Sequence, residues 1–433
     1  MKQIFLFFLL LLISIPFLIG NTEKKITLET EAVIPVAIFS PETESWTLLS
    51  KLNEGDELLE KIELSVGDKD IVYYEDRITR NGEKISIAKK MFKEPEKEIA
   101  LKLLDTSTGE IKVIKIQQRG AELISPFGYK IEIVERLNGI RWNKWNTNYK
   151  VVEPVNYIVL KNKYPAEVEY TTVKKTVTDK TGKKKNISQK QKIVKGFVYA
   201  PYSEDLHTPE IIEAGRQHIK LIVQNAFDEL SKKGIKSKIF PDKLVSEIEA
   251  LPPRFFERLT VLEQSDLGEF TLNPQKTTER VLVLIGSNGQ NAFSKTGSKA
   301  GALGWIQFTS STYKIISKSY PAAKLIKDFE KGAADHLNSM MAAILLHNSN
   351  LSELVKSHGE KVLKDPRLEE YLASAYNGGA SRVNSSLRAS ASYGLKDWAS
   401  CLLPKKIQKK SCLFPETKGF VFKLRTLQAN DWP

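Results

Sequence analysis

The hydrophobic pattern of this chain changes its period near residue 205. Before that point, apolar residues alternate with polar ones or form short β-branched runs, which is typical of strands. Thr208 then supplies a helix N-cap and Pro209 a first helical residue, and apolar residues recur at helical spacing to about residue 394. The pattern predicts an α+β multidomain protein, with a β-rich domain at residues 21–204 and a mainly α-helical domain at residues 205–433 that ends in a C-terminal extension.

Two hairpins are expected in the β-rich region. Asn81-Gly82 lies between two β-branched runs, and this pair is the strongest short hairpin signal. A longer hairpin is expected between residues 170–177 and 187–198, with a basic tip made by Lys183, Lys184 and Lys185. Trp142 and Trp145 could form a sugar-binding platform, but tryptophans in a β-domain more often belong to its core. The residues of this region identify neither its fold nor its role.

The first twenty residues have the composition of an export signal. Lys2 precedes an apolar run from Ile4 to Ile19, and Gly20 and Asn21 return the chain to polar sequence. This order is typical of a secretory signal peptide, and the run is marginal for a membrane span. We expect residues 1–20 to direct export to the periplasm or cell wall, with membrane attachment only if the segment is retained. No cysteine follows the run, which disfavours a lipid-modified N-terminus.

Cys401 and Cys412 are the two cysteines of the sequence. In an exported protein, such a pair is expected to form a disulfide, here closing a small lysine-rich loop. Two free thiols are the alternative. The spacing fits neither a redox pair nor a zinc site.

The formal net charge of +13 favours a polyanionic partner or a solvated lysine-rich surface. No helix-turn-helix or RNA-recognition signature accompanies the charge, so nucleic acid is not expected as a partner. An anionic cell-wall polymer or lipid surface fits the charge equally well.

A glycine-rich string in the helical region points to a site that approaches its ligand closely. Residues 301–308 read GALGWIQF, and Ser298 precedes them. Gly301 and Gly304 let the backbone approach a sugar without an intervening Cβ. The Gln307 amide offers both a donor and an acceptor to hydroxyl or N-acetyl groups.

A second string, LASAYNGGASRV at residues 372–383, contains Tyr376, Asn377 and Gly378. In this order, the two strings resemble the core motifs of the lytic transglycosylases, over roughly residues 250–390. The resemblance implies a lysozyme-like domain with a small β-hairpin, which cleaves peptidoglycan between N-acetylmuramic acid and N-acetylglucosamine and leaves a 1,6-anhydro ring. It also implies that Tyr376 orients a catalytic carboxylate. Substrate would be held by Gln307 and Asn377, in a cleft that includes Gly301, Gly304, Ser298 and Gly378.

The chain departs from the family at the position of the catalytic acid. The usual register of the family glutamate is occupied by Gln290, whose amide cannot donate a proton as a carboxylic acid does. The apolar run 281–285, followed by Gly-Ser-Asn-Gly, predicts a strand and hairpin turn, so Gln290 is expected in an inserted hairpin.

Glu263 is the alternative acid. Residues 252–263 begin with two prolines and have helical periodicity, which places Glu263 at the end of the apolar face of a helix. A carboxyl group there is partly desolvated, which raises its pKa. Asp266 either serves as the second carboxylate of a hydrolase or caps the next turn.

Three functions therefore remain in view. The first is a lytic transglycosylase that uses Glu263 alone, and the second is a hydrolytic muramidase that also uses Asp266. The third is a catalytically silent protein that binds or scaffolds peptidoglycan, with Gln290 marking the lost acid. The β-rich half could also carry the main role, as a module that binds the wall or a partner. The sequence has no metal motif of the His-Glu-x-x-His type and no phosphate-binding glycine loop, so no metal or cofactor is expected.

Overall fold

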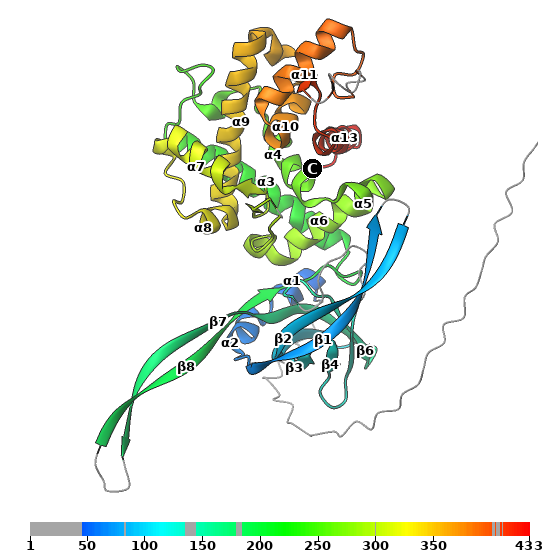
Figure 1. Ribbon diagram of the computed structural model, residues 1–433, viewed down its shortest axis with the longest axis vertical. Helices are drawn as coiled ribbons and strands as arrows, with labels where there is room; N and C mark the ends of the chain where they lie inside the picture. Colours follow the sequence, from blue (N-terminus) through cyan, green and yellow to red (C-terminus); the bar gives the residue numbers. More distant parts are fainter. Residues whose placement is uncertain are drawn as a thin grey trace, which may run out of the picture.

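The computed structural model describes residues 46–81, 84–134, 144–178, 184–298, 300–400, 403, 408 and 410–433 (Figure 1). Strands dominate up to Tyr199, and helices follow from Pro209 onward. The expected order of a β-rich region followed by a mainly helical region is therefore confirmed. The expected signal segment, Trp142 and Cys401 lie outside the described residues.

The β-rich region is built on antiparallel sheets. The larger sheet has the strand order β4-β3-β2-β7-β8, and β1 pairs with the distal part of β2. Its strands are β1 (Val66–Asn81), β2 (Lys84–Asp105), β3 (Ile111–Arg119), β4 (Glu122–Ile124), β7 (Tyr157–Thr178) and β8 (Lys184–Tyr199). A second, two-stranded sheet pairs β5 (Lys130–Ile133) with β6 (Tyr149–Glu153).

Both predicted hairpins are present. Asn81 pairs with Lys84, and Thr178 pairs with Lys184, at the distal ends of β1–β2 and β7–β8. Each hairpin extends as a two-stranded ribbon well beyond the body of the sheet (Figure 1). Large apolar side chains are exposed along both ribbons: Val72, Tyr74, Ile87 and Met91 on the first, and Val168, Tyr170, Val173 and Ile193 on the second.

Two short helices that the sequence did not predict precede the sheet. These are α1 (Leu48–Asn53), capped by Thr47, and α2 (Asp56–Lys61). Buried lysines of the sheet donate to carbonyls at their C-terminal ends: Lys102 on β2 to Leu52 and Glu54, and Lys163 on β7 to Glu60 and Ile62. An ammonium group at the negative end of a helix is electrostatically favourable, so these lysines fix both helices to the sheet.

Trp145 packs edge-on against Phe197 and Tyr199 of β8, with ring centroids 5.6 and 4.5 Å apart. It is half-buried in this aromatic cluster. Trp145 therefore packs with other aromatic residues of the β-rich region, as expected for a core tryptophan.

The helical region packs around the long α9 (His336–His358), which is buried along most of its length (Figure 1). The other helices of this region are α3 (Pro209–Lys232), α4 (Pro253–Gln264), α5 (Leu267–Leu272), α6 (Pro274–Asn288), α7 (Ser310–Ser319), α8 (Phe329–Ala334), α10 (Leu368–Gly378), α11 (Ala380–Tyr393) and α13 (Pro415–Ala429). Short 3-10 turns link them: η1 (Val245–Glu247), η2 (Gly289–Asn291), η3 (Pro321–Ala323) and η4 (Glu360–Lys364). Thr208 caps α3 as predicted, and its side chain accepts from the Ile211 amide.

The predicted strand and hairpin at residues 281–289 is wrong, because residues 281–288 belong to α6 and Gly289 begins η2. Asn273 caps this helix and Pro274 begins it. Its apolar run packs closely on α3: a Cβ on Gly286 would lie 2.1 Å from the Ile211 carbonyl oxygen. Tertiary packing thus overrides the strand preference of the β-branched residues. The small hairpin of this region lies instead within the glycine-rich string, as β9 (Ala302–Leu303) and β10 (Phe308–Thr309).

The two regions are joined by a shared core and by one asparagine. Leu52, Leu104 and Leu160 of the β-rich region pack in the same apolar cluster as the helices. Asn288, at the end of α6, accepts from the Ala200 amide (2.7 Å) and donates to the Ala200 carbonyl (2.9 Å). The chain therefore passes from strands to helices without a free linker.

Within the described residues, every helix falls short of the length or apolar character needed to cross a lipid bilayer. Cys412 is buried and disulfide-bonded. Its expected partner, Cys401, lies outside the described residues.

Candidate active site

The glycine-rich string forms a compact turn closed by β9 and β10. Gly301 and Gly304 both have left-handed backbones, with φ of +79° and +80°. A Cβ on Gly304 would lie 2.0 Å from the Ala333 carbonyl oxygen of α8, whereas a Cβ on Gly301 would meet open space. Gly304 is thus required both by its conformation and by packing, and Gly301 by conformation alone.

Ser298 and Gln307 hold this turn together. The Ser298 Oγ accepts from the Ala302 amide (3.1 Å), and the Ser298 amide donates to the Ala302 carbonyl (2.9 Å). Gln307 has a left-handed φ of +49°, and its Nε2 donates to the Gly304 carbonyl (2.7 Å). Gln307 is half-buried. Ser298 and Gln307, which were predicted to line the substrate cleft, therefore also shape the turn through these hydrogen bonds.

Helix α4 ends against the same turn. Gln264, its last residue, donates from Nε2 to the carbonyls of Gly304 (3.1 Å) and Trp305 (2.7 Å). The predicted helix at residues 252–263 is confirmed by α4, and Glu263 is its penultimate residue. These hydrogen bonds from the Gln264 side chain hold the end of α4, which carries Glu263, against the glycine-rich turn. The sequence did not predict this link.

Tyr376 on α10 reaches the turn from the other side. Its hydroxyl donates to the Ile306 carbonyl (2.5 Å), and its ring lies edge-on to Phe308, with centroids 5.9 Å apart. The ring also stacks on His347, at 5.0 Å and an interplanar angle of 10°. The His347 Nδ1 donates to the Ala343 carbonyl (2.8 Å), and burial lowers the pKa of this histidine to about 4, so it is a neutral packing partner. The two sequence strings, 70 residues apart at this contact, thus meet in space.

The environment of Glu263 favours the protonated carboxylic acid. Burial raises the pKa of Glu263 to about 8, nearby Lys423 opposes that rise, and Glu416 adds to it. Burial, together with the charge of Glu263, raises the pKa of Tyr376 well above its ordinary value. The Tyr376 hydroxyl donates its one hydrogen bond to the Ile306 carbonyl, so its oxygen can only accept a hydrogen bond from the carboxyl group.

Lys423 on α13 is the cation of this site. Its buried ammonium group donates to the carbonyls of Leu262 and Ser265 at the end of α4, and to the Ser265 hydroxyl (3.2 Å). Burial lowers the pKa of Lys423, whereas the acidic groups around it, with Glu263 foremost, raise it. A lysine within the buried stripe of α13 (Phe420, Val421, Leu424 and Leu427) was the sequence signal that could have identified this residue.

The second string also packs on α13. The Asn377 Oδ1 accepts from the Thr417 hydroxyl (2.7 Å). A Cβ on Gly378 would lie 2.7 Å from the same Thr417 oxygen. Asn377 is half-buried near the end of α10, and part of its side chain is therefore engaged by the protein itself.

Asp266 and Gln290 are both exposed, whereas Glu263 is half-buried, and Asp266 shares with Glu263 an electrostatic interaction with Lys423. Asp266 is exposed and caps α5, accepting from the Glu269 amide (3.0 Å), which is the capping alternative for this residue. Gln290 is exposed in η2. The residues on either side of it contact other parts of the protein: the Ala292 carbonyl accepts from His336 (2.8 Å), and Asn288 binds Ala200. The hydrogen bonds from α4 to the glycine-rich turn run instead through Gln264, and the charge of Glu263 acts on Tyr376.

No protein-family model matches this chain, and no curated protein sequence matches it at a significant level. Within the described residues, no group of three or more His, Cys, Asp or Glu side chains could hold a metal ion. The arrangement offers a single carboxylic acid of raised pKa at the end of a helix, beside a polar backbone turn, and this is a suitable general acid.

Proposed function

We propose that the chain is an exported peptidoglycan lytic transglycosylase whose lysozyme-like domain spans residues 205–433. One observation carries the proposal: Glu263, with a pKa raised to about 8, lies in the last turn of a helix whose final residue, Gln264, is bound to the glycine-rich turn that Tyr376 also contacts. A general acid that works near neutral pH needs a carboxyl group of raised pKa in a partly desolvated position.

The proposed reaction uses one carboxyl group twice. Protonated Glu263 donates its proton to the glycosidic oxygen between N-acetylmuramic acid and N-acetylglucosamine, and the bond from C1 to that oxygen breaks. The resulting carboxylate then takes the proton from the C6 hydroxyl of the muramyl residue. The C6 oxygen bonds to C1 and closes the 1,6-anhydro ring, which restores the acid. No second carboxylate is required, in keeping with Asp266 being used as a helix cap.

The surrounding residues suit these two steps. Burial favours the neutral acid before the first transfer, while the Lys423 ammonium group stabilises the carboxylate after it. Tyr376 is a positioning residue, because its hydroxyl donates to the Ile306 carbonyl and leaves only acceptor capacity for the acid. Substrate hydroxyl and N-acetyl groups would contact Gln307 and Asn377.

Replacing Glu263 with glutamine tests the proposal. Glu263→Gln keeps the size of the side chain and removes its proton, so we expect release of soluble muropeptides from purified sacculi to fall at least about a thousandfold, in line with the loss of a general acid and of the following base step. Gln290→Ala is the matched control and should retain wild-type release. Sedimentation with sacculi should be unchanged in both variants.

Two outcomes contradict the assignment. Wild-type release by Glu263→Gln would remove Glu263 from the chemistry. Absence of turnover in the wild-type protein, with binding to sacculi intact, would instead support a catalytically silent wall-binding protein.

A further inference from the structure

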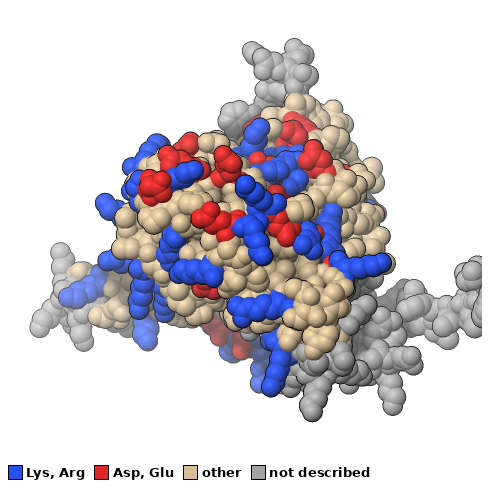
Figure 2. Space-filling model, turned by 90° about the horizontal axis from the view of Figure 1, so that it is seen from above, with Lys and Arg blue, Asp and Glu red and all other residues tan. Residues whose placement is uncertain are grey.

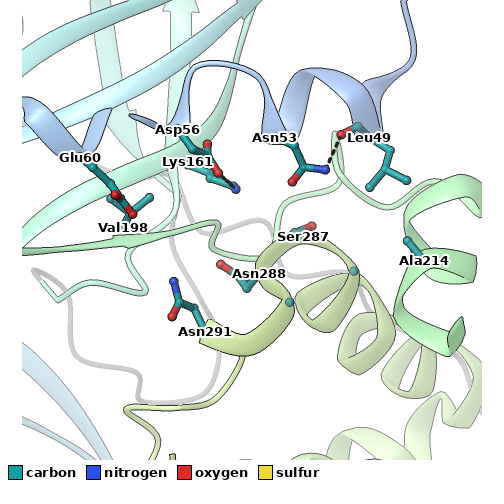
Figure 3. A pocket seen from close by; sticks show the side chains of 12 residues that line it. Leu49, Asn53, Asp56, Glu60, Lys161, Val198, Ala214, Ser287, Asn288 and Asn291 are labelled. Atoms are coloured by element: carbon teal, nitrogen blue, oxygen red, sulfur yellow. Dashed lines mark hydrogen bonds and ion pairs between the residues drawn. The ribbon is translucent and has the colours of Figure 1, made fainter. Parts of the chain in front are cut away.

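A polar cavity of about 420 Å³ lies between the β-rich and helical regions, and its lining includes neither Glu263 nor the glycine-rich turn. One wall comes from α1 and α2, with Asn53, Asp56 and Glu60, and the opposite wall from the end of α6 and η2 (Figure 3). Lys161 of β7 lines it from the sheet. A volume of this size is within the range of small-molecule sites.

Lys161 brings a buried positive charge to the cavity. Its side chain is only 8% exposed, and its ammonium group lies 2.5 Å from the Asp56 carboxylate. The same carboxylate also forms an ion pair with the fully buried Lys102, so the single negative charge of Asp56 is shared by two lysines. An ammonium group has three donors, and within the described residues the hydrogen bond to Asp56 is the one that Lys161 makes. Buried donors without acceptors are costly, and an anionic oxygen in the cavity would satisfy them.

Glu60 brings a negative charge to the same cavity. It is exposed on α2 and forms no ion pair within the described part of the chain, although it lies in electrostatic reach of Lys163. The Lys163 ammonium group is itself held by the carbonyls of Glu60 and Ile62. The Glu60 carboxylate is therefore available to a cationic group that enters the cavity.

The opposite wall offers neutral hydrogen-bonding groups. Ser287 is only 3% exposed, and its buried hydroxyl has no hydrogen-bond partner in the structure. Asn291 is exposed at the end of η2, whereas the amide of Asn288 is already occupied by Ala200. The described lining contains no aromatic ring on which the apolar face of a sugar could pack.

We infer that this cavity binds a small zwitterion, namely an amino acid or a short peptide. The ligand carboxylate binds the Lys161 ammonium group, the ligand ammonium group binds the Glu60 carboxylate, and Ser287 and Asn291 contact the polar atoms between them. Such a ligand supplies the acceptor that Lys161 lacks and a cation for Glu60. The inference does not depend on the proposed transglycosylase activity.

Isothermal titration calorimetry of the protein, with both its β-rich and its helical region, against D-alanyl-D-alanine tests this inference. We expect saturable binding that weakens at least tenfold in Lys161→Met and in Glu60→Gln. Glu60 is exposed, so Glu60→Gln should fold normally even if Lys161→Met does not. Lys130→Met, a surface lysine paired with Glu132, and Glu263→Gln are the controls and should bind like the wild type.

The neutral probes N-acetyl-D-alanine amide and N-acetylglucosamine should not bind, because they lack the two charges. Equal binding of the neutral probes, or dipeptide binding that both Lys161→Met and Glu60→Gln retain, would overturn the inference. Absence of any saturable dipeptide binding to the wild-type protein would overturn it as well. Loss of dipeptide binding in Glu263→Gln alone would move the site to the candidate active site.

Discussion

At the scale of single residues, buried Lys423 and half-buried Glu263 interact although they lie far apart in the sequence. Burial favours the neutral form of each group, and their mutual attraction favours the charged forms. A group with a raised pKa stays protonated up to the higher pH, so Glu263 carries its proton below about pH 8 and loses it above. The activity that depends on this proton is therefore expected at neutral pH and should decline as pH rises through about 8.

Removing the ammonium group of Lys423 should move this decline. In Lys423→Met the carboxylate loses its stabilising cation, so the pKa of Glu263 rises further and the alkaline limb of the pH–rate profile shifts to higher pH. The variant also leaves the carbonyls of Leu262 and Ser265 without their donor, which should lower the free energy of unfolding by about 1–3 kcal/mol. Activity measured across pH 5–10 and chemical denaturation report the two effects.

Lys418→Met is the matched control for that experiment. Lys418 lies on the same helix and donates to the Ser400 carbonyl (2.7 Å), away from Glu263. Its pH–rate profile should match that of the wild type. An alkaline limb that stays in place in Lys423→Met would show that Lys423 does not act on the catalytic proton.

At the scale of elements, the glycine-rich turn depends on two glycines for different reasons. Gly301→Ala introduces only backbone strain, expected to cost about 1–2 kcal/mol for an alanine in the left-handed region. Gly304→Ala adds a clash with the Ala333 carbonyl, so its total cost should reach about 2–5 kcal/mol when overpacking is included. Thermal unfolding of the two variants compares them directly, and equal losses of stability would contradict this account of the turn.

The elements also show what the sequence could and could not predict. The helix that carries Glu263 was predictable because its prolines and its apolar period agree, and the β1–β2 hairpin was predictable from Asn81-Gly82. Helix α6 was not, because its β-branched run favours a strand locally and only packing on α3 makes it helical. A lysine in the apolar stripe of α13 could single out Lys423, but the partners of Lys423 and Gln264 are backbone atoms distant in the sequence, which no local pattern specifies.

At the scale of the whole molecule, the lysine and arginine residues are unevenly distributed along the chain. Figure 2 shows Lys and Arg interspersed with Asp and Glu over the helical end, without one dominant patch. The distal β7–β8 ribbon differs, since lysines greatly outnumber acids between residues 170 and 190. A two-stranded ribbon has little core of its own, so a projecting basic ribbon is suited to contact a polyanion.

We therefore expect the β7–β8 ribbon to strengthen attachment to anionic wall polymer. Lys174 and Lys190 are exposed on this ribbon, and replacing both with glutamine should weaken sedimentation with teichoic-acid-bearing sacculi and reduce its dependence on salt. Turnover of a short soluble glycan should be unaffected, because the distal ribbon lies far from α4, the helix that carries Glu263 (Figure 1). Unchanged sedimentation at low salt would exclude this role of the ribbon.

The mass of the released muropeptides tests the central claim most directly. If one carboxyl group acts as both acid and base, as proposed for Glu263, the wild-type protein should release products that end in 1,6-anhydro-N-acetylmuramic acid. These products are lighter by one water molecule than those of hydrolysis and resist borohydride reduction. Products with reducible N-acetylmuramic acid ends would contradict the single-carboxylate mechanism and indicate a hydrolytic muramidase.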